Sequence, residues 1–377
     1  MSLDNAFVKG MPKLGFGLMR LPQQDGEIDI PQTSRMVDMF LEAGFRYFDT
    51  AYGYGDGASE RAIKVALVDR YPRDSFYLAT KLPAWAGAKN AEEAKAMFTT
   101  SLERTGAGYF DFYLLHNLGE NRTRYFDDYG IWDFLAEQKA KGLIHRLGFS
   151  FHDKAAVLDE ILTAHPDVEF VQLQINYLDW ESESVESRKC WETARRHGKP
   201  VIIMEPVKGG NLATPPKSVR ELFASARPGD SPAAWALRFA ASLDGVITVL
   251  SGMSNVEQMQ DNLNTFKNFE PMGDRDLETI EQARALINRV PTIQCTACEY
   301  CMKGCPMNIA IPGIFRTFNM YKRFQALDWA KGDYAWNTEA HGKGKASDCI
   351  ECGRCEAVCP QHLPIREELK NAAAALE

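Results

Sequence analysis

The chain has 377 residues, of which 45% are hydrophobic and 25% are charged. This composition is ordinary for a globular protein and excludes a disordered chain, and the length allows a large domain followed by a small one. The formal net charge of −8 argues against nucleic acid as a main partner, because binding to phosphates requires a basic surface.

The N-terminal residues MSLDNAFVKG contain no apolar segment of the kind found in secretory signals. No window approaches the run of about 18 apolar residues that a membrane-spanning helix needs. We therefore expect a cytoplasmic protein with no membrane partner. In a reducing cytosol, grouped cysteines are more often metal ligands than disulfides.

Short β-rich runs alternate with longer amphipathic runs over most of the chain. Eight such runs occupy residues 14–21, 45–51, 76–82, 110–116, 145–151, 170–178, 200–207 and 245–252. Helical patterns lie between them, for example at 91–106, which ends in glycine, a common helix C-cap. Eight strands with intervening helices predict an α/β TIM (β/α)8 barrel. The alternative is an open doubly wound sheet, which would need a G-x-G-x-x-G turn that GFGLMR does not supply.

Polar residues close most of the predicted strands. In a TIM barrel such positions gather at one open end, where the chemistry takes place. Any one of these residues is also explained by a structural hydrogen bond or a surface ion pair, but their convergence favours a functional site. They are Asp49, Lys81, His116, Ser150, Asn176 and Glu205, and Tyr54 follows Asp49 in a loop.

Six motifs give the chain a resemblance to the aldo-keto reductase family over roughly residues 10–270. They are FDTAYGYGDGASE, LATK, DFYLLH, GFS, VQLQINY and VLSGMSNVEQMQDN. The resemblance implies a catalytic tetrad of Asp49, Tyr54, Lys81 and His116. It also implies reduction of a small carbonyl substrate by hydride transfer.

In such a tetrad Tyr54 is the general acid in reduction and the general base in oxidation. Lys81 is expected to lower the tyrosine pKa, because a nearby ammonium favours the tyrosinate. Asp49 would pair with Lys81 and hold it in place, and His116 would hydrogen-bond the carbonyl oxygen.

The family binds NADP(H) in an extended form across the barrel mouth, which implies a set of contact residues here. Phe151 stands where the family commonly has asparagine, and Asn255 stands where an arginine often clamps the 2′-phosphate, so NAD(H) remains an alternative. Met204 takes the place of the aromatic residue that stacks on the nicotinamide. The other implied contacts are Ser150 and Gln172 at the carboxamide, Gly17, Met19 and Arg20 near the reacting ring, Pro206, Gly209 and Leu212 at the pyrophosphate, and Ser251, Gly252, Ser254, Gln258 and Asn262 at the adenosine.

Two cysteine runs share the spacing C-x2-C-x2-C-x3-C-P. They contain Cys295, Cys298, Cys301 and Cys305, followed by Pro306, and Cys349, Cys352, Cys355 and Cys359, followed by Pro360. This is the bacterial ferredoxin signature. A pair of zinc sites is the alternative, but zinc sites use two cysteine pairs separated by a longer loop. Cys190, on an expected helix, is interpreted as an inert buried thiol.

The resemblance to two-cluster ferredoxins implies two [4Fe-4S] clusters with exchanged fourth ligands. Cys295, Cys298, Cys301 and Cys359 would hold one cluster, and Cys349, Cys352, Cys355 and Cys305 the other.

Apolar residues recur at three- and four-residue steps between the cysteine runs, from Ile311 to Phe324, which predicts an amphipathic helix. We therefore predict a barrel domain at 1–288 and a small, mostly helical ferredoxin-type domain at 289–377, with a helical insert at 311–345. The small domain is expected to need its clusters in order to fold.

Three functions remain open on the sequence. The first is NAD(P)H-dependent carbonyl reduction with structural or sensing clusters. The second is electron transfer that couples the barrel through the clusters to an external redox partner protein. Nicotinamide moves two electrons and a cluster moves one, so this coupling usually needs a flavin, for which no motif is present. The third is a barrel that has lost turnover and only binds.

Overall fold

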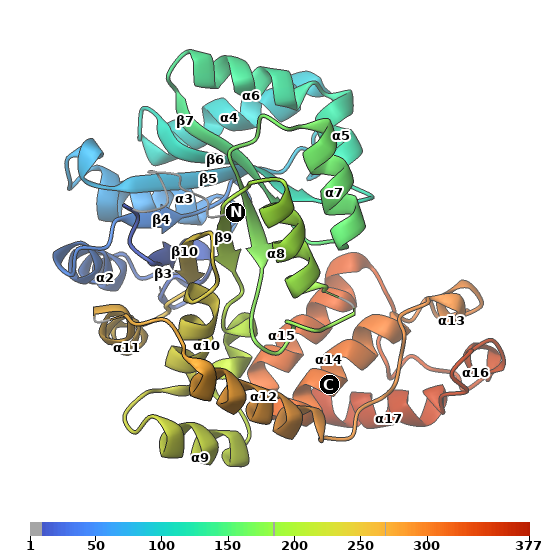
Figure 1. Ribbon diagram of the computed structural model, residues 1–377. Coiled ribbons are helices and arrows are strands. Elements are labelled where there is room, and N and C mark those ends of the chain that lie inside the picture. The colour runs from blue at the N-terminus through green and yellow to red at the C-terminus, as the bar shows by residue number, and fades with distance from the viewer. Residues whose placement is uncertain (1–9, 184, 268) are drawn as a thin grey trace. The chain divides into compact units, whose positions relative to one another are not determined.

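The computed structural model of the protein describes residues 10–183, 185–267 and 269–377, and Figure 1 traces the chain through them. Residues 1–9, which carry most of the segment on which the expected absence of a signal depends, lie outside the described residues. Within the described ranges, no helix combines the length and the apolar character needed to cross a bilayer.

Eight parallel strands form a closed barrel, which confirms the predicted TIM barrel and excludes the open sheet. Each strand pairs with its neighbour in the chain, and β1 closes the ring between β10 and β4. The strands are β1 (Leu14–Gly17), β4 (Tyr47–Asp49), β5 (Tyr77–Leu82), β6 (Phe110–Leu118), β7 (Ile144–Phe151), β8 (Phe170–Gln174), β9 (Val201–Met204) and β10 (Val246–Ser251). A separate hairpin joins β2 (Gln23–Gln24) and β3 (Glu27–Ile28).

Helices follow the strands and surround the barrel (Figure 1). Local signals set their ends: Asp29 caps α2 by accepting the N–H of Gln32 at 2.9 Å, and α4 ends at Gly106, whose φ of 63° suits glycine. The helices are α2 (Ile30–Glu42), α3 (Ala58–Ile63), α4 (Ala91–Thr105), α5 (Thr123–Asp128), α6 (Ile131–Ala140), α7 (Ala155–Ala164), α8 (Ser187–Arg196), α10 (Pro232–Ala241) and α11 (Val256–Lys267).

Side chains fill the barrel interior. The rings of Tyr47 and Phe112 lie 4.9 Å apart, those of Phe112 and Phe170 lie 5.4 Å apart, and all three residues are buried. The interior is therefore a packed core and not a channel. A ligand can reach only the ends of the strands.

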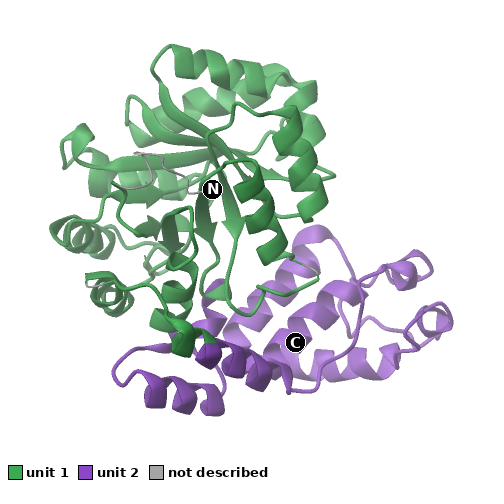
Figure 2. Cartoon of the chain, in the orientation of Figure 1, with its two compact units in different colours: residues 1–208, 233–277 green, residues 209–232, 278–377 purple. Residues whose placement is uncertain are grey.

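The chain divides into two compact units (Figure 2): residues 1–208 with 233–277, and residues 209–232 with 278–377. The predicted boundary at residue 288 falls just beyond this division and stays a prediction. The helices that lie wholly or largely in the second unit are α9 (Lys217–Ala226), α12 (Asp274–Asn288), α13 (Tyr300–Lys303), α14 (Ile311–Phe324), α15 (Leu327–Asn337), α16 (Arg354–Ala357) and α17 (Ile365–Leu376).

The second unit has its own apolar core, built around α14. This helix packs against α15 and α17 and buries Ile311, Ile314, Phe315 and Phe318. The predicted helical character of this region is confirmed. The two cysteine runs lie on either side of this helical segment in the sequence.

Candidate active site and cysteine-lined cavities

A buried ion pair lies at the carboxyl ends of β4 and β5. The ammonium of Lys81 donates to Oδ1 of Asp49 and, at 2.7 Å, to the main-chain oxygen of Thr50. Both side chains are almost fully buried. Burial opposes the charge on Lys81, but Asp49 and Tyr54 together outweigh burial and hold the pKa of Lys81 above its ordinary value. The lysine is therefore a fixed cation at neutral pH.

Tyr54 lies beside this cation. Its hydroxyl is 3.5 Å from Nζ of Lys81, and the same Nζ is 5.0 Å from the centroid of the tyrosine ring. Burial raises the pKa of Tyr54, and the opposing charge of Lys81 does not cancel this effect. Lys81 lowers the pKa of Tyr54, as expected, but desolvation raises it by more, so the pKa lies above its ordinary value. The phenol stays protonated at neutral pH and is able to donate a proton.

His116 completes the predicted tetrad. The register of β6 against β7 shifts between Leu115 and Leu118, and Asn117 has a φ of 61°. This bulge changes the direction of the strand at His116. The imidazole lies 6.0 Å from the Tyr54 ring, centroid to centroid. Burial, followed by the charge of Lys81, holds the pKa of His116 well below its ordinary value, so the ring is neutral. The structure thus places all four tetrad residues in one group.

The loop that carries Tyr54 is held by residues that the sequence reasoning did not select. Glu60 is fully buried and accepts from the hydroxyl of Thr80 at 2.8 Å and from Arg104 at 3.2 Å. Arg104 also donates to the main-chain oxygen of Tyr52 at 3.0 Å. A Cβ at Gly57, whose φ is 78°, would lie 2.5 Å from the Arg104 guanidinium. Glu60 is the last residue of the motif FDTAYGYGDGASE, so its place in that motif was the sequence signal that could have identified it.

Two predicted cofactor residues are register partners on adjacent strands. Ser150 on β7 pairs with Gln172 on β8, and both are buried. The Ser150 hydroxyl oxygen accepts the N–H of Asn117 at 2.8 Å, which leaves its proton to donate. The Gln172 amide nitrogen donates to Oδ2 of Asp49 at 3.1 Å, which leaves its amide oxygen to accept. One donor and one acceptor side by side complement a primary carboxamide.

The predicted cofactor residues at and after the ends of β1 and β10 fall in two short segments that contact each other. Ser254 donates to the main-chain oxygen of Arg20 at 2.8 Å, and Met19 is exposed. A Cβ at Gly17 would lie 3.4 Å from the main-chain oxygen of Ser251, so the end of β1 and the loop after β10 pack closely.

Within these segments some side chains are already engaged. The Gln258 side chain accepts the N–H of Ser254 at 2.8 Å, and Asn262 is buried and donates to Ser251 at 2.6 Å. Gly252 is exposed beside them. Ser251 and Asn262 therefore serve the structure of the loop.

The segment after β9 is divided between the units. Met204 ends β9, and Glu205 and Lys208 follow with φ values of 56° and 49°. Pro206 lies in the first unit, whereas Gly209 and the buried Leu212 lie in the second unit.

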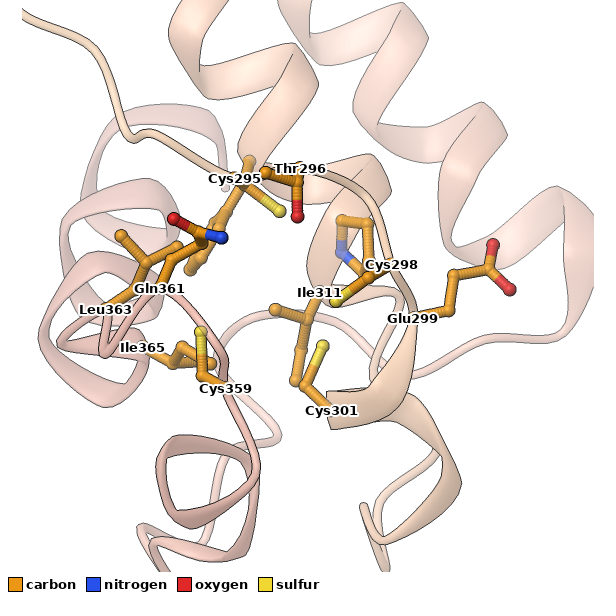
Figure 3. Close-up of a pocket in the computed structure, with 12 residues that line it drawn as sticks. Cys295, Thr296, Cys298, Glu299, Cys301, Ile311, Cys359, Gln361, Leu363 and Ile365 are labelled. Atoms are coloured by element: carbon orange, nitrogen blue, oxygen red, sulfur yellow. The ribbon is translucent and has the colours of Figure 1, made fainter.

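Four cysteines from both runs line one small cavity in the second unit (Figure 3). Their sulfur atoms point toward a common centre from separate loops (Figure 3). We call Cys295, Cys298, Cys301 and Cys359 the first set. Three members come from the first run and the fourth from the end of the second run.

The complementary four cysteines line another small cavity. We call Cys305, Cys349, Cys352 and Cys355 the second set. Ile311 lines both cavities, so the two are adjacent across its side chain.

The two cysteine loops repeat the same backbone. Ala297 and Glu351 both have a φ of 55°, and Glu299 and Gly353 have values of 61° and 74°. Within the described residues no three histidine, cysteine or acidic side chains are close enough to hold a single metal ion. Four thiols line each cavity. Four cysteines are the donor set that iron–sulfur clusters use, so the residues fit them.

Comparison with known proteins agrees with this geometry. The model of the aldo/keto reductase family matches residues 13–285, and the model of a 4Fe-4S dicluster domain matches residues 294–364. The chain therefore belongs to the aldo/keto reductase family of oxidoreductases and carries an iron–sulfur domain C-terminal to the barrel.

Individual relatives give the same assignment. An aldo-keto reductase of Mycolicibacterium vanbaalenii is 30% identical over 70% of this chain and 86% of its own length. Another, from Mycolicibacterium smegmatis, is 34% identical over 37% of this chain, and the match spans less than half of that relative, 44%. The structure of an aldo-keto reductase from Klebsiella pneumoniae in complex with NADPH has a TM-score of 0.59 at 20% identity, covering 72% of this chain and 90% of the other.

Proposed function

We propose that the protein reduces a small carbonyl compound with NADP(H), or alternatively NAD(H), and that Tyr54 is the general acid. The observation that carries this proposal is the Tyr54 hydroxyl 3.5 Å from a buried, charged Lys81. The nicotinamide, when bound, supplies the hydride. Ser150 and Gln172 would hold its carboxamide through their free donor and acceptor.

Each side chain of the tetrad has a separate role in the proposed reaction. Asp49 and the main chain of Thr50 fix the Lys81 ammonium, so that its charge stabilises the phenolate left when Tyr54 has donated its proton. Neutral His116 is able to donate one hydrogen bond to the carbonyl oxygen and to orient it. The Nδ1 atom of His116 has no partner among the residues that the structure describes.

The experiment is an anaerobic assay with the full chain. NADPH or NADH is mixed with an aromatic aldehyde such as 4-nitrobenzaldehyde, and loss of absorbance at 340 nm is compared with alcohol formed. We expect one alcohol for each NADPH oxidised. The absence of nicotinamide binding, measured by quenching of tryptophan fluorescence, would contradict the proposal.

A second candidate function is electron transfer to an external protein. The apolar side chains of Tyr300, Ile350 and Val358, which lie within the cysteine runs, are 49–61% exposed. Exposed apolar side chains near a redox centre are able to form a small contact surface for a transiently bound electron-transfer protein. In the same anaerobic assay, reoxidation of dithionite-reduced protein by the aldehyde or by NADP+ would favour this function.

We further propose that the second unit binds two [4Fe-4S] clusters with exchanged ligands. The first and second sets of cysteines, which line separate cavities, support this assignment. A bound cluster carries one electron. Cys298 and Cys352 are the exposed members of their sets, whereas Cys301 and Cys355 are buried.

Double substitutions test the exchange. Cys295→Ala and Cys359→Ala are expected each to remove about four of about eight irons, and together to remove no more than either alone. Cys349→Ala combined with Cys359→Ala is expected to remove all of the iron. Iron and sulfide analysis of anaerobically purified protein gives the counts. Cys190→Ala, in the first unit, is the control and should keep the full count.

The opposite pattern would overturn the assignment. If Cys349→Ala and Cys359→Ala together cost no more iron than either alone, each cysteine run would hold its own cluster. Stoichiometric zinc in place of iron and sulfide would support the zinc alternative.

A further inference from the structure

An arginine is held on an aromatic platform at the rim of the barrel. The indole nitrogen of Trp85 donates to the main-chain oxygen of His116 at 2.7 Å, which fixes the ring after β5. The guanidinium carbon of Arg122, in the loop after β6, lies 4.6 Å from the centroid of that ring. Stacking on an aromatic face restricts a side chain that is otherwise free in solvent.

Among the residues that the structure describes, the guanidinium of Arg122 has no anionic partner. Its side chain makes no hydrogen bond or ion pair there and stacks on Trp85. The carboxylate of Asp153 is already engaged by the main-chain N–H groups of Glu120 and Lys154, each at 2.8 Å. The five N–H donors of a guanidinium suit bidentate binding of a carboxylate.

A short series of contacts connects this arginine with the proton donor. The ring of Tyr54 lies 6.0 Å from that of His116, and the ring of His116 lies 6.3 Å from that of Trp85. The charge of Arg122 is also among the causes, after burial, Lys81 and His152, that lower the pKa of His116. Two side chains, His116 and Trp85, therefore connect the proton donor with this cation, and Tyr54, Trp85 and Arg122 all lie in segments that follow the carboxyl ends of β4, β5 and β6.

We propose that Arg122 binds a carboxylate of the substrate, and that the carbonyl compounds reduced at Tyr54 are anionic, with an acid group a few bonds from the carbonyl. This inference rests on the proposed carbonyl reduction. Trp85 acts as a positioning residue, because its ring is fixed to the main chain of His116 and supports the guanidinium. The site is open to solvent, so the preference over a neutral analogue is about tenfold, at the lower end of the range for charged hydrogen bonds.

The test compares two substrates of the same size, 4-formylbenzoate and 4-formylbenzamide, at saturating NADPH. The measured quantity is the ratio of kcat/KM for the acid to that for the amide. We expect this ratio to fall about tenfold in Arg122→Gln, and to recover in part in Arg122→Lys, which restores the charge without the planar donors. Arg124→Gln is the matched control: Arg124 lies two residues further on, over the ring of Tyr125 at 5.1 Å, and the variant should leave the ratio unchanged.

A binding measurement separates this inference from the proposed function. Calorimetric titration of the holoprotein with 4-formylbenzoate should show about tenfold weaker binding in Arg122→Gln, whether or not turnover is observed. Equal binding by the variant and the original protein would overturn the inference. A rise in the KM for NADPH with both aldehydes would also overturn it, since Arg122 would then bind a cofactor phosphate. Failure of the proposed function appears differently, as reduction that survives Tyr54→Phe.

Discussion

Tyr54→Phe is expected to lower kcat for carbonyl reduction by about 10²–10⁴-fold, the usual contribution of general acid catalysis. The substitution removes the hydroxyl that lies beside Lys81 and leaves the ring, which contacts both Lys81 and His116, in place. Nicotinamide binding should persist, because the contacts proposed for the carboxamide come from other strands. Single-turnover and steady-state assays under anaerobic conditions measure the loss.

The pH profile provides a second measurement of the same role. Reduction needs the protonated phenol, and burial raises the pKa of Tyr54 above its ordinary value. The rate of reduction should therefore stay level through neutral pH and decline only as the pH rises through that pKa. The decline should be absent from the residual activity of Tyr54→Phe. Tyr77→Phe is the matched control, because Tyr77 begins β5 and Lys81 lies near the other end of that strand. Full activity in Tyr54→Phe would show that another group donates the proton.

Removal of iron is expected to disorder the two cysteine loops of the second unit and to leave its helical core folded. Segments 294–308 and 347–363 have little regular structure beyond the short helices α13 and α16. The helices α14, α15 and α17, by contrast, bury a common apolar core. Binding of metal by such loops is coupled to their folding, so the two parts should respond differently.

Hydrogen exchange before and after anaerobic chelation measures this difference. Amides of the two loops should lose protection, whereas amides of α14 should lose little, because Ile314 and Phe315 are fully buried in the core. The barrel strands serve as the internal control and should be unchanged. The sequence-based expectation was that the whole small domain needs its clusters, and uniform loss of protection across the second unit would favour that expectation.

Local sequence was sufficient for much of the fold because the barrel is built from short-range patterns. Each of the eight predicted runs contains a strand of the closed barrel. The turn at Gly106 and the amphipathic stripe of α14 were also read directly from residue type and spacing. The β6 bulge at His116 was not predictable, because it arises from the register of β6 against β7, a contact between distant segments.

The sequence by itself determined which residues are proposed to carry the chemistry: the tetrad around Tyr54 and the two cysteine runs with their spacing. Only the tertiary structure decided the burial, the pKa shifts and the hydrogen-bond partners of these residues. Burial, and not only Lys81, sets the pKa of Tyr54, and Gln172 donates to Asp49 while its amide oxygen stays available. The position of Arg122 over Trp85 was likewise invisible in the sequence. The physical reason is that desolvation and hydrogen bonding depend on distances between loops far apart in the chain, which a local pattern does not encode.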